Sequence, residues 1–388
     1  MSRLRKILFV ITRAEMGGAQ THVVDLLRGM QGRVDGHVAT GEHGYLTETA
    51  AAMGVPFSVL PDLVQPTHPW KDNKALLALR RVIAELRPDI VHTHTSKAGT
   101  LGRLAARLAG VPAIFTAHSW AFSEGVSWKW KAIGIPTERL AARWTSRIIN
   151  VSEANRRLAL AHRVGAPGLH VTIHNGIEDS PLRATPGEDS AEPRVIMVAR
   201  FAAQKNHRLL LDAAASLARP FRLVLVGDGP LRTEMEALAR TLGIASRVEF
   251  TGERRDVGQL LASSHVFALA TNWEGLPISI LEALRAGLPV VSSDVGGVNE
   301  MVTEGGNGFL VNPGDTPGFA GVLDRLLADS AMRAHMGRAS RTRFENEFTS
   351  ESMIEKTLTV YQGVLSGGAL PSPTVLGAER ISIHEVTQ

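Results

Sequence analysis

Short apolar runs rich in Val, Ile and Leu alternate along the chain with longer stretches in which apolar residues recur every three or four positions. The short runs predict strands, and the longer stretches, such as 19–30 and 74–87, predict helices. Strands that are apolar along their whole length are typical of parallel sheets covered by helices on both faces. The predicted strands are 6–12, 36–40, 89–92, 113–117, 147–151 and 171–174 in the first half, and 194–199, 222–227, 247–251, 265–269, 289–292 and 308–311 in the second.

Each half of this pattern predicts one doubly wound α/β domain, and 388 residues are too many for a single core. Segment 177–193 is polar, contains prolines and lacks periodicity, which indicates a linker. We expect domains at 1–176 and 194–349, a helix near 350–364 that packs back on the first domain, and a loose tail at 366–388. Two Rossmann-like domains facing each other form a cleft, and ligands of such sheets bind at the carboxyl ends of the strands.

The amino-acid composition excludes several kinds of chemistry. Apolar residues make up 44% of the chain and charged residues 21%, as in globular proteins. The chain has no cysteine, which excludes disulfides, thiolate metal ligands and a cysteine nucleophile and is compatible with a reducing cytoplasm. The apolar run at 7–11 is too short for a signal peptide, and no segment approaches the ~20 apolar residues of a membrane span.

Positive charge is concentrated in one sector. Residues 97–163 hold eleven Lys and Arg against three Glu, although the net charge of the chain is only +4. Within this sector, tryptophans alternate with basic residues, which resembles an interfacial membrane patch. The alternative is a solvated basic helix with core tryptophans. The candidate membrane or acceptor residues here are Trp128, Lys129, Trp130, Lys131 and Arg143. We expect an anionic membrane surface as the partner rather than a nucleic acid, because no nucleic-acid-binding signature is present.

Two glutamates flank a turn in the second half. Glu274 follows a predicted strand, Gly275-Leu276-Pro277 forms the turn, and a helix starting there carries Glu282. The first carboxylate can accept hydrogen bonds from sugar hydroxyls, the second can hold a ribose, and free N–H groups between them can face a diphosphate. The same spacing recurs at Glu347 and Glu355 in a solvated helical pattern, so the context rather than the spacing carries this prediction.

Three further loops follow predicted strands. Arg200 and Lys205 suit a diphosphate, because they would neutralise charge on a leaving phosphate; the alternative is an exposed pair on a loop. The Gly17-Gly18 loop allows close approach of a phosphate or sugar, or is only a tight turn. Its spacing is not that of an NAD site. Gly227-Asp228-Gly229 either borders a nucleotide or is likewise a turn.

Histidines and an Asn-Gly pair mark the rim of the first domain. His92 and His94 alternate along one strand and so point to the same face. We interpret His92 as structural. His118 closes strand 113–117, and we interpret it as a hydrogen-bond partner of a sugar hydroxyl. No nearby carboxylate completes a metal site, so we expect none. Asn175-Gly176, at the mouth of the linker, predicts a turn or hinge.

Together these motifs resemble family 4 of the retaining glycosyltransferases, which have the GT-B fold. The resemblance spans residues 6 to about 362 and includes Asp294–Glu300 and Gly308–Val311. It implies that Glu282 binds the ribose, Glu274 and His118 contact the donor sugar, and Arg200 and Lys205 hold the diphosphate. The implied donor-binding positions also include Gly17, Gly18, Asn175, Gly227, Gly229, Gly275, Leu276 and Pro277.

The stretch from His92 to Gly99 resembles the subgroup that builds surface polysaccharides, O-antigens and exopolysaccharides, which makes His94 and Lys97 acceptor candidates. One departure is Ser119-Trp120, where many relatives have Gly or Asp, and it leaves the acceptor side open. The resemblance implies transfer of a hexosyl group, with retention, from a nucleotide sugar (UDP by family frequency) to a glycan or polyprenyl-diphosphate-linked acceptor. We expect no cofactor, no metal, and a cytoplasmic protein on the inner face of the membrane. The alternatives are a nucleotide-sugar epimerase and a non-catalytic glycan- or nucleotide-binding protein.

Overall fold

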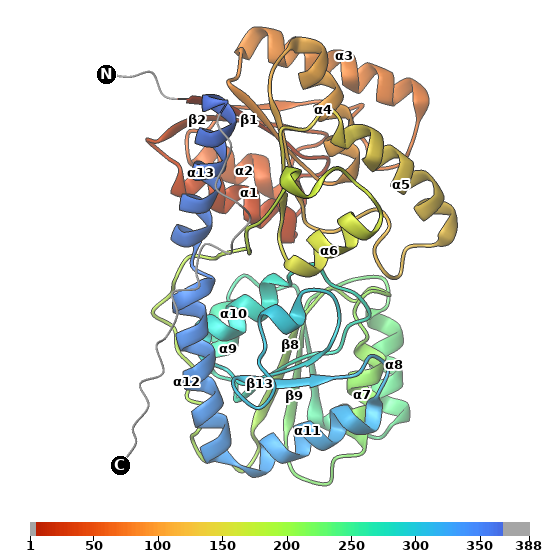
Figure 1. Ribbon diagram of the computed structural model, residues 1–388. Coiled ribbons are helices and arrows are strands. Elements are labelled where there is room, and N and C mark those ends of the chain that lie inside the picture. Colours follow the sequence, from red (N-terminus) through yellow and green to blue (C-terminus); the bar gives the residue numbers. More distant parts are fainter. Residues whose placement is uncertain (1–4, 368–388) are drawn as a thin grey trace.

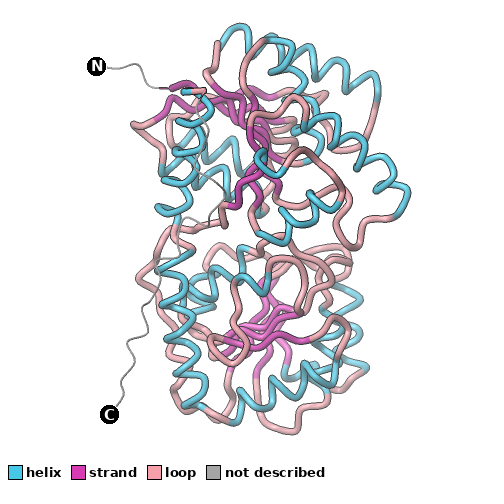
Figure 2. The backbone as a smooth tube through the Cα atoms, in the orientation of Figure 1, coloured by secondary structure: helices cyan, strands magenta, loops and turns pink. Residues whose placement is uncertain are grey.

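The computed structural model describes residues 5–367, which form two α/β domains stacked end to end (Figure 1). In each domain a block of parallel strands lies between helices, and many loops gather in the region between the two blocks (Figure 2). This is the expected pair of Rossmann-like domains.

The N-terminal sheet has seven strands in the order β3-β2-β1-β4-β5-β6-β7, and all neighbours are parallel. Its strands are β1 (Arg5–Val10), β2 (Val34–Thr40), β3 (Phe57–Val59), β4 (Ile90–His94), β5 (Ala113–Ala117), β6 (Arg147–Asn150) and β7 (His170–Thr172). Its helices are α1 (Gly18–Gly29), α2 (Tyr45–Ala52), α3 (Pro69–Leu86), α4 (Ser96–Ala109), α5 (Trp128–Ala142) and α6 (Glu153–Ala161). The sequence pattern missed β3, because this strand has only three residues and lies between Pro56 and Pro61.

The C-terminal sheet has six strands in the order β10-β9-β8-β11-β12-β13, again all parallel. Its strands are β8 (Arg194–Val198), β9 (Arg222–Val226), β10 (Val248–Gly252), β11 (Val266–Leu269), β12 (Val290–Ser293) and β13 (Gly308–Val311). Its helices are α7 (His207–Ala215), α8 (Arg232–Thr241), α9 (Val257–Ala262), α10 (Ile278–Ala286), α11 (Thr316–Ala328) and α12 (Ser330–Glu347). The six strands predicted for this half are all present.

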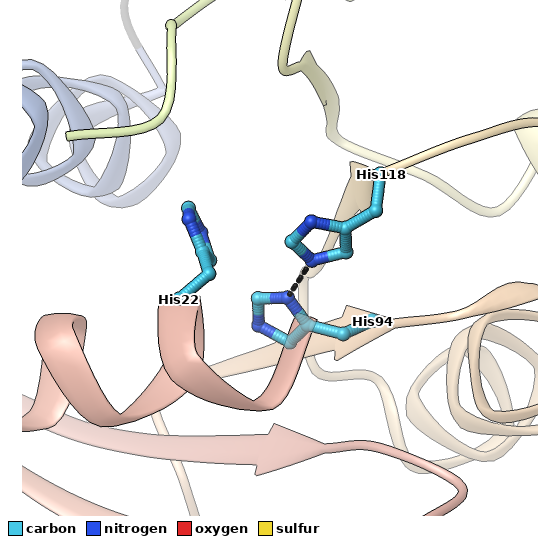
Figure 3. Close-up of side chains that lie close together, drawn as sticks. All are labelled: His22, His94 and His118. Carbon is cyan, nitrogen blue, oxygen red and sulfur yellow. Dashed lines mark hydrogen bonds between the residues drawn. The ribbon is translucent and has the colours of Figure 1, made fainter. Parts of the chain in front are cut away.

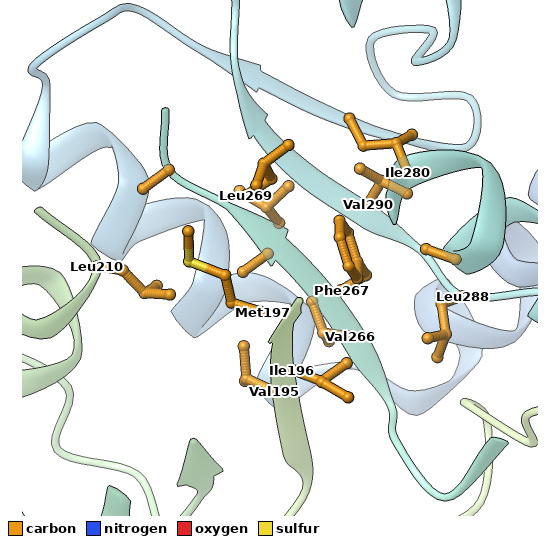
Figure 4. Close-up of a cluster of buried hydrophobic side chains, with 14 of the residues drawn as sticks. Val195, Ile196, Met197, Leu210, Val266, Phe267, Leu269, Ile280, Leu288 and Val290 are labelled. Atoms are coloured by element: carbon orange, nitrogen blue, oxygen red, sulfur yellow. The ribbon is translucent and has the colours of Figure 1, made fainter. Parts of the chain in front are cut away.

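The core of this domain explains why its strands read as unbroken apolar runs. Val195, Ile196 and Met197 follow one another on the central strand β8 and are all buried, so both faces of the sheet are covered (Figure 4). Phe267 and Val290, on β11 and β12, are also fully buried. Removing a side chain of this size from water stabilises the fold by about 1.5–3 kcal/mol.

The chain returns to the first domain at its end. Helix α13 (Ser350–Ser366) lies beside α1 (Figure 1), and its Met353, Ile354 and Tyr361 belong to the N-terminal hydrophobic core. Ser366 was predicted to begin the tail, but it is the last residue of this helix. The rest of the predicted tail, from residue 368, lies outside the described residues.

The two connections between the domains run side by side. Ile177 N–H donates to the Phe348 carbonyl at 3.0 Å, and Ser350 N–H donates to the Ile177 carbonyl at 3.0 Å. A Cβ at Gly176 would lie 2.2 Å from the Thr349 carbonyl oxygen, so this contact requires glycine.

The segment predicted as a linker contains no helix or strand, yet it is fastened to the second domain. Buried Arg333 donates to the Pro186 carbonyl at 2.6 Å, and Arg341 holds both carboxylate oxygens of Asp179 at 2.6 Å. The hydrogen bonds from Arg341 lower the pKa of Asp179 to about 2. Segment 177–193 is therefore attached to the C-terminal domain.

Candidate active site

The carboxyl ends of the two sheets meet at the interface between the domains. His118 follows β5 of the first domain, and Gly275 follows β11 of the second. A Cβ at Gly275 would lie only 2.0 Å from the His118 carbonyl oxygen. The sequence places glycine here because the two loops touch backbone to backbone.

Glu274 and Lys205 form an ion pair at this interface. Strand pairing explains the contact, since β8 lies beside β11 and Lys205 forms a bridge with Thr271. Thr271 Oγ1 donates to Glu274 Oε1 at 2.7 Å, and the Glu274 and Lys205 side chains are 5% and 15% exposed. An ammonium that can face a phosphate and a carboxylate that can accept from hydroxyls are thus held together.

Arg200 lies on the loop after β8, and its side chain is exposed. Within residues 5–367 its guanidinium has no hydrogen-bond or ion-pair partner, so its charge is available to an anion. Gly227 and Gly229 pack on this loop: a Cβ would lie 2.2 Å from the Ala199 oxygen at the first and 2.4 Å from the Phe201 oxygen at the second. Both have positive φ, at 135° and 152°, so packing of the Arg200 loop accounts for these glycines, and a nucleotide contact stays a prediction.

Glu282 lies in the second turn of α10 and is half-buried. Burial raises the pKa of its carboxyl, and the nearby charge of Arg285 acts in the opposite direction. Pro277 is the N-cap residue just before the first turn of α10, and it makes no side-chain cap hydrogen bond. A Cβ at Gly18 would contact Ile278 at 3.6 Å, so the Gly17-Gly18 loop reaches the first turn of α10 across the interface.

Asn175 also links the domains. It is buried, and its Nδ2 donates to the carbonyl of Leu276 at 3.2 Å. The Asn-Gly pair that the sequence marked as a hinge therefore contacts the turn that carries Glu274.

Glu300 is an interface residue whose role was not predicted from the sequence. It ends the short 3-10 helix η3 (Val298–Glu300) and accepts hydrogen bonds from the amides of Glu153 and Ala154 at 2.7 and 2.8 Å. Its carboxylate also bonds His174 Nε2 at 2.9 Å. Burial alone would raise the pKa of Glu300, but the bonds from His174 and the two amides outweigh it and lower the pKa. The only sequence signal was its place at the end of Asp294–Glu300.

Three histidines converge beside this interface. His22 on α1, His94 at the end of β4 and His118 after β5 lie close together, and His94 Nδ1 is 3.2 Å from His118 Nε2 (Figure 3). The sequence gives no signal for His22, because this residue lies in a helix that is distant from the other two histidines in the chain. His92 bonds Tyr361 Oη and Thr116 Oγ1, each at 2.7 Å, and is structural as predicted.

The structure corrects one acceptor candidate and gives the other an ion-pair partner. His94 is fully buried, so it is not a surface contact for an acceptor or a membrane. Lys97 pairs with Asp72 at 2.6 Å, much as Lys205 pairs with Glu274, and its contact with an acceptor stays a prediction. Part of the basic sector is likewise internal, since buried Arg103 pairs with Glu138.

Helix α5 and its C-cap residue Arg143 carry part of the exposed charge of the basic sector. Trp128 and Trp130 are 74% and 55% exposed, so for these two the alternative of core tryptophans is wrong. Lys129 and Arg143 are also exposed, and Lys131 is half-buried. None of the helices in the described part of the chain is both long and apolar enough to cross a bilayer.

Comparison with known proteins decides the family. The model for glycosyltransferase family 4 matches residues 16–180, and the model for group 1 glycosyl transferases matches residues 179–343. The UDP-Gal:alpha-D-GlcNAc-diphosphoundecaprenol alpha-1,3-galactosyltransferase of Escherichia coli is 30% identical over 334 residues, which cover 82% of this chain and 85% of the relative. This chain is a family 4 glycosyltransferase.

Two further similarities agree with this membership. The O-antigen biosynthesis glycosyltransferase WbnH of Escherichia coli is 26% identical over 369 residues, 94% of this chain and all of the relative. The structure of Anabaena HepE in complex with UDP and glucose superposes with a TM-score of 0.79 at 22% identity, covering 92% of this chain and 100% of HepE. The predicted family, GT-B fold and enzyme class are confirmed, and the epimerase and non-catalytic alternatives are set aside.

Proposed function

We propose that this glycosyltransferase moves a hexosyl group from a UDP-sugar, with retention of configuration, to a glycan or polyprenyl-diphosphate-linked glycan during surface polysaccharide synthesis. The observation that carries the proposal is the Lys205–Glu274 ion pair at the meeting of the two sheets, beside His118 and the first turn of α10. The UDP and glucose bound to HepE, and the donor and acceptor in the name of the Escherichia coli galactosyltransferase, support the two substrate classes.

Each residue of the site is assigned to one part of the nucleotide sugar. Within residues 5–367 the Glu282 carboxylate makes no hydrogen bond, which leaves it able to accept both hydroxyls of a ribose. Arg200 and Lys205 face the diphosphate together with the unpaired N–H groups of the first turn of α10. Glu274 and His118 then orient the sugar. The same charges that bind the diphosphate also stabilise it as it leaves.

Transfer follows a front-face route. The bond between the anomeric carbon and the diphosphate oxygen breaks, and the acceptor oxygen bonds to that carbon on the same face. The acceptor proton passes to the leaving phosphate oxygen. Glu274 is held by Lys205 and Thr271, and we assign it to positioning rather than to nucleophilic attack. This route needs positioning and positive charge, which Arg200, Lys205 and α10 supply without a metal ion.

Turnover with a panel of nucleotide sugars tests this assignment. We expect Arg200→Ala and Lys205→Ala each to lower kcat by about 100-fold or more, because each removes charge from the leaving group. Glu282→Gln should mainly raise the KM for the donor. Arg254→Ala, which removes a surface arginine paired with Asp256, is the matched control and should leave turnover unchanged. If Arg200→Ala and Lys205→Ala stayed within about twofold of the wild type, the assignment would be wrong.

We also propose that the enzyme binds the inner face of the membrane through α5. The first turn of α5 exposes Trp128 and Trp130 among basic residues, which suits the interface of an anionic bilayer. Because α5 follows the loop that begins at His118, this orientation would bring a lipid-linked acceptor to the domain interface.

A further inference from the structure

Three imidazole rings from three separate elements meet at the carboxyl end of the N-terminal sheet. One nitrogen from each of His22, His94 and His118 lies within 4.8 Å of the others, and two of these rings are fully enclosed (Figure 3). Zn–N bonds of about 2.0–2.1 Å in a tetrahedral site place ligand nitrogens about 3.3 Å apart. His94 Nδ1 and His118 Nε2, at 3.2 Å, already have this spacing, and His22 needs to approach by at most about 1.5 Å.

Hydrogen bonds within the protein do not satisfy this cluster. His94 Nε2 is buried and has no hydrogen-bond partner among the described residues, and His22, which is also buried, has only the Asn175 side chain beside it, whose interaction raises the pKa of His22 against the effect of burial. A buried polar atom left in this way costs roughly 1–3 kcal/mol. Neighbouring His92 differs, because both its nitrogens are hydrogen-bonded. The cluster is thus a set of nitrogen lone pairs and N–H groups that lack enough protein partners.

The rings are also in the protonation state that a metal ion requires. Burial lowers the pKa of His22 to about 4 and lowers the pKa values of His94 and His118 well below the usual range, so all three are neutral at pH 7. Neutral imidazole is a ligand for Zn²⁺, Co²⁺, Ni²⁺ and Cu²⁺. No carboxylate joins this set of three, so the hard ions Mg²⁺ and Ca²⁺ are disfavoured.

We infer that His22, His94 and His118 form a binding site for a divalent transition metal such as Zn²⁺ or Co²⁺. This modifies the expectation from the sequence that the protein has no metal site. The metal would not be a cofactor. This part of the inference rests on the proposed function, in which His118 contacts the donor sugar. Because a His118 ring that binds the metal cannot also contact the sugar, metal binding and productive donor binding exclude each other. A transition metal is then a reversible inhibitor that acts at the sugar end of the donor site.

Titration of the tag-free enzyme with Co²⁺, followed by visible absorption, tests the site directly. We expect one saturable Co²⁺ per chain with the d–d bands of a four- or five-coordinate nitrogen site. His22→Gln and His94→Gln should each weaken Co²⁺ binding by at least about tenfold, whereas a wild-type-like circular dichroism spectrum verifies that each variant is folded. Two controls should bind as the wild type does: His92→Gln, which alters a hydrogen-bonded neighbour in the same strand, and His43→Gln, which removes an exposed histidine.

The outcomes separate the metal site from the proposed function. Absence of a saturable band, or equal Co²⁺ binding by the wild type, His22→Gln and His94→Gln, would overturn the site. With donor and acceptor present, Zn²⁺ should inhibit the wild type, a chelator should reverse this, and His22→Gln should need a higher Zn²⁺ concentration for the same fractional loss. Co²⁺ binding with no such inhibition would retain the site and overturn its link to the donor. If no nucleotide sugar were turned over at all, the Co²⁺ titration would still decide whether the site exists.

Discussion

Asp25 lies on the buried side of α1, with its carboxylate 3.6 Å from Arg28. Burial raises its pKa to about 7, Arg28 opposes this shift, and the negative charges of Glu178 and Glu282 add to it. The carboxyl group therefore titrates close to neutral pH, although its usual value is 3.8. Between about pH 4 and pH 7 the folded state binds more protons here than the unfolded state does. The contribution of Asp25 to the free energy of unfolding thus falls as the pH rises through this window.

Asp25→Asn removes this dependence. We expect the free energy of unfolding of the variant, relative to the wild type, to increase by on the order of 2 kcal/mol between pH 5 and pH 8. Chemical denaturation at the two pH values measures the change. Asp35→Asn, which alters an exposed carboxylate on β2, is the matched control and should show no such difference. A constant difference between Asp25→Asn and the wild type at both pH values would contradict the prediction.

Some of the site residues could be predicted from the sequence, and others could not. Glu274, Lys205 and Arg200 could be placed at strand ends, because the strand pattern sets where a parallel sheet presents its loops. The direct contact between Lys205 and Glu274 depends on β8 lying beside β11, which periodicity does not reveal. His22 and Glu300 could not be found in the same way, since each acquires its partners only when distant segments come together. The roles of the site residues in catalysis stay predictions.

The loop between β5 and α5 is the element that connects the exposed helix to the donor side. A Cβ at Gly125, in this loop, would lie 2.3 Å from the ring of Trp273, which precedes Glu274 in the second domain. Gly125 also has a φ of 78°, which favours glycine. The Trp273 carbonyl accepts a hydrogen bond from Gln204 at 2.8 Å, next to Lys205. A change in this loop is thereby transmitted to the residues around the ion pair.

We expect Gly125→Ala to lower kcat by roughly tenfold or more, because the added methyl group displaces Trp273 and misplaces Glu274. Steady-state kinetics with saturating donor measures the effect. Gly110→Ala supplies a matched control: Gly110 has a φ of 71° but no atom within 4 Å of its added Cβ. The same backbone strain without the collision should change kcat little. Equal kinetics for the two variants would refute a role for the contact with Trp273.

Elements were predicted more completely than their contacts. Twelve strands follow from unbroken apolar runs, and β3 did not, because three residues between prolines give no such signal. The polar composition of segment 177–193 predicted a free linker, but Arg333 and Arg341 bind it to the second domain. Composition indicates which residues avoid the core, but it does not indicate which partners a polar segment binds in the folded chain.

At the scale of the whole molecule, the exposed first turn of α5 predicts how the enzyme binds a membrane. We expect the protein to float with vesicles that contain anionic phospholipid at low salt and to be released at high salt. Trp128→Ser combined with Trp130→Ser should abolish flotation, because the apolar anchors are lost. Leu182→Ser, which removes an exposed apolar side chain from the second domain, should have no effect. Failure of the wild type to co-migrate at low salt would rule out this mode of binding.

The paired connections at Ile177 and Thr349 have a consequence for engineering. Both crossings between the domains occur at one place, joined by backbone hydrogen bonds, so residues 178–348 form a cassette whose two ends lie side by side. A chimera that exchanges this cassette for that of another family member has one covalent junction to match, must also preserve the loop contacts across the interface, and leaves α13 on the recipient's own N-terminal core. Most of the proposed donor-binding residues would then be exchanged together, while His118 would stay with the recipient.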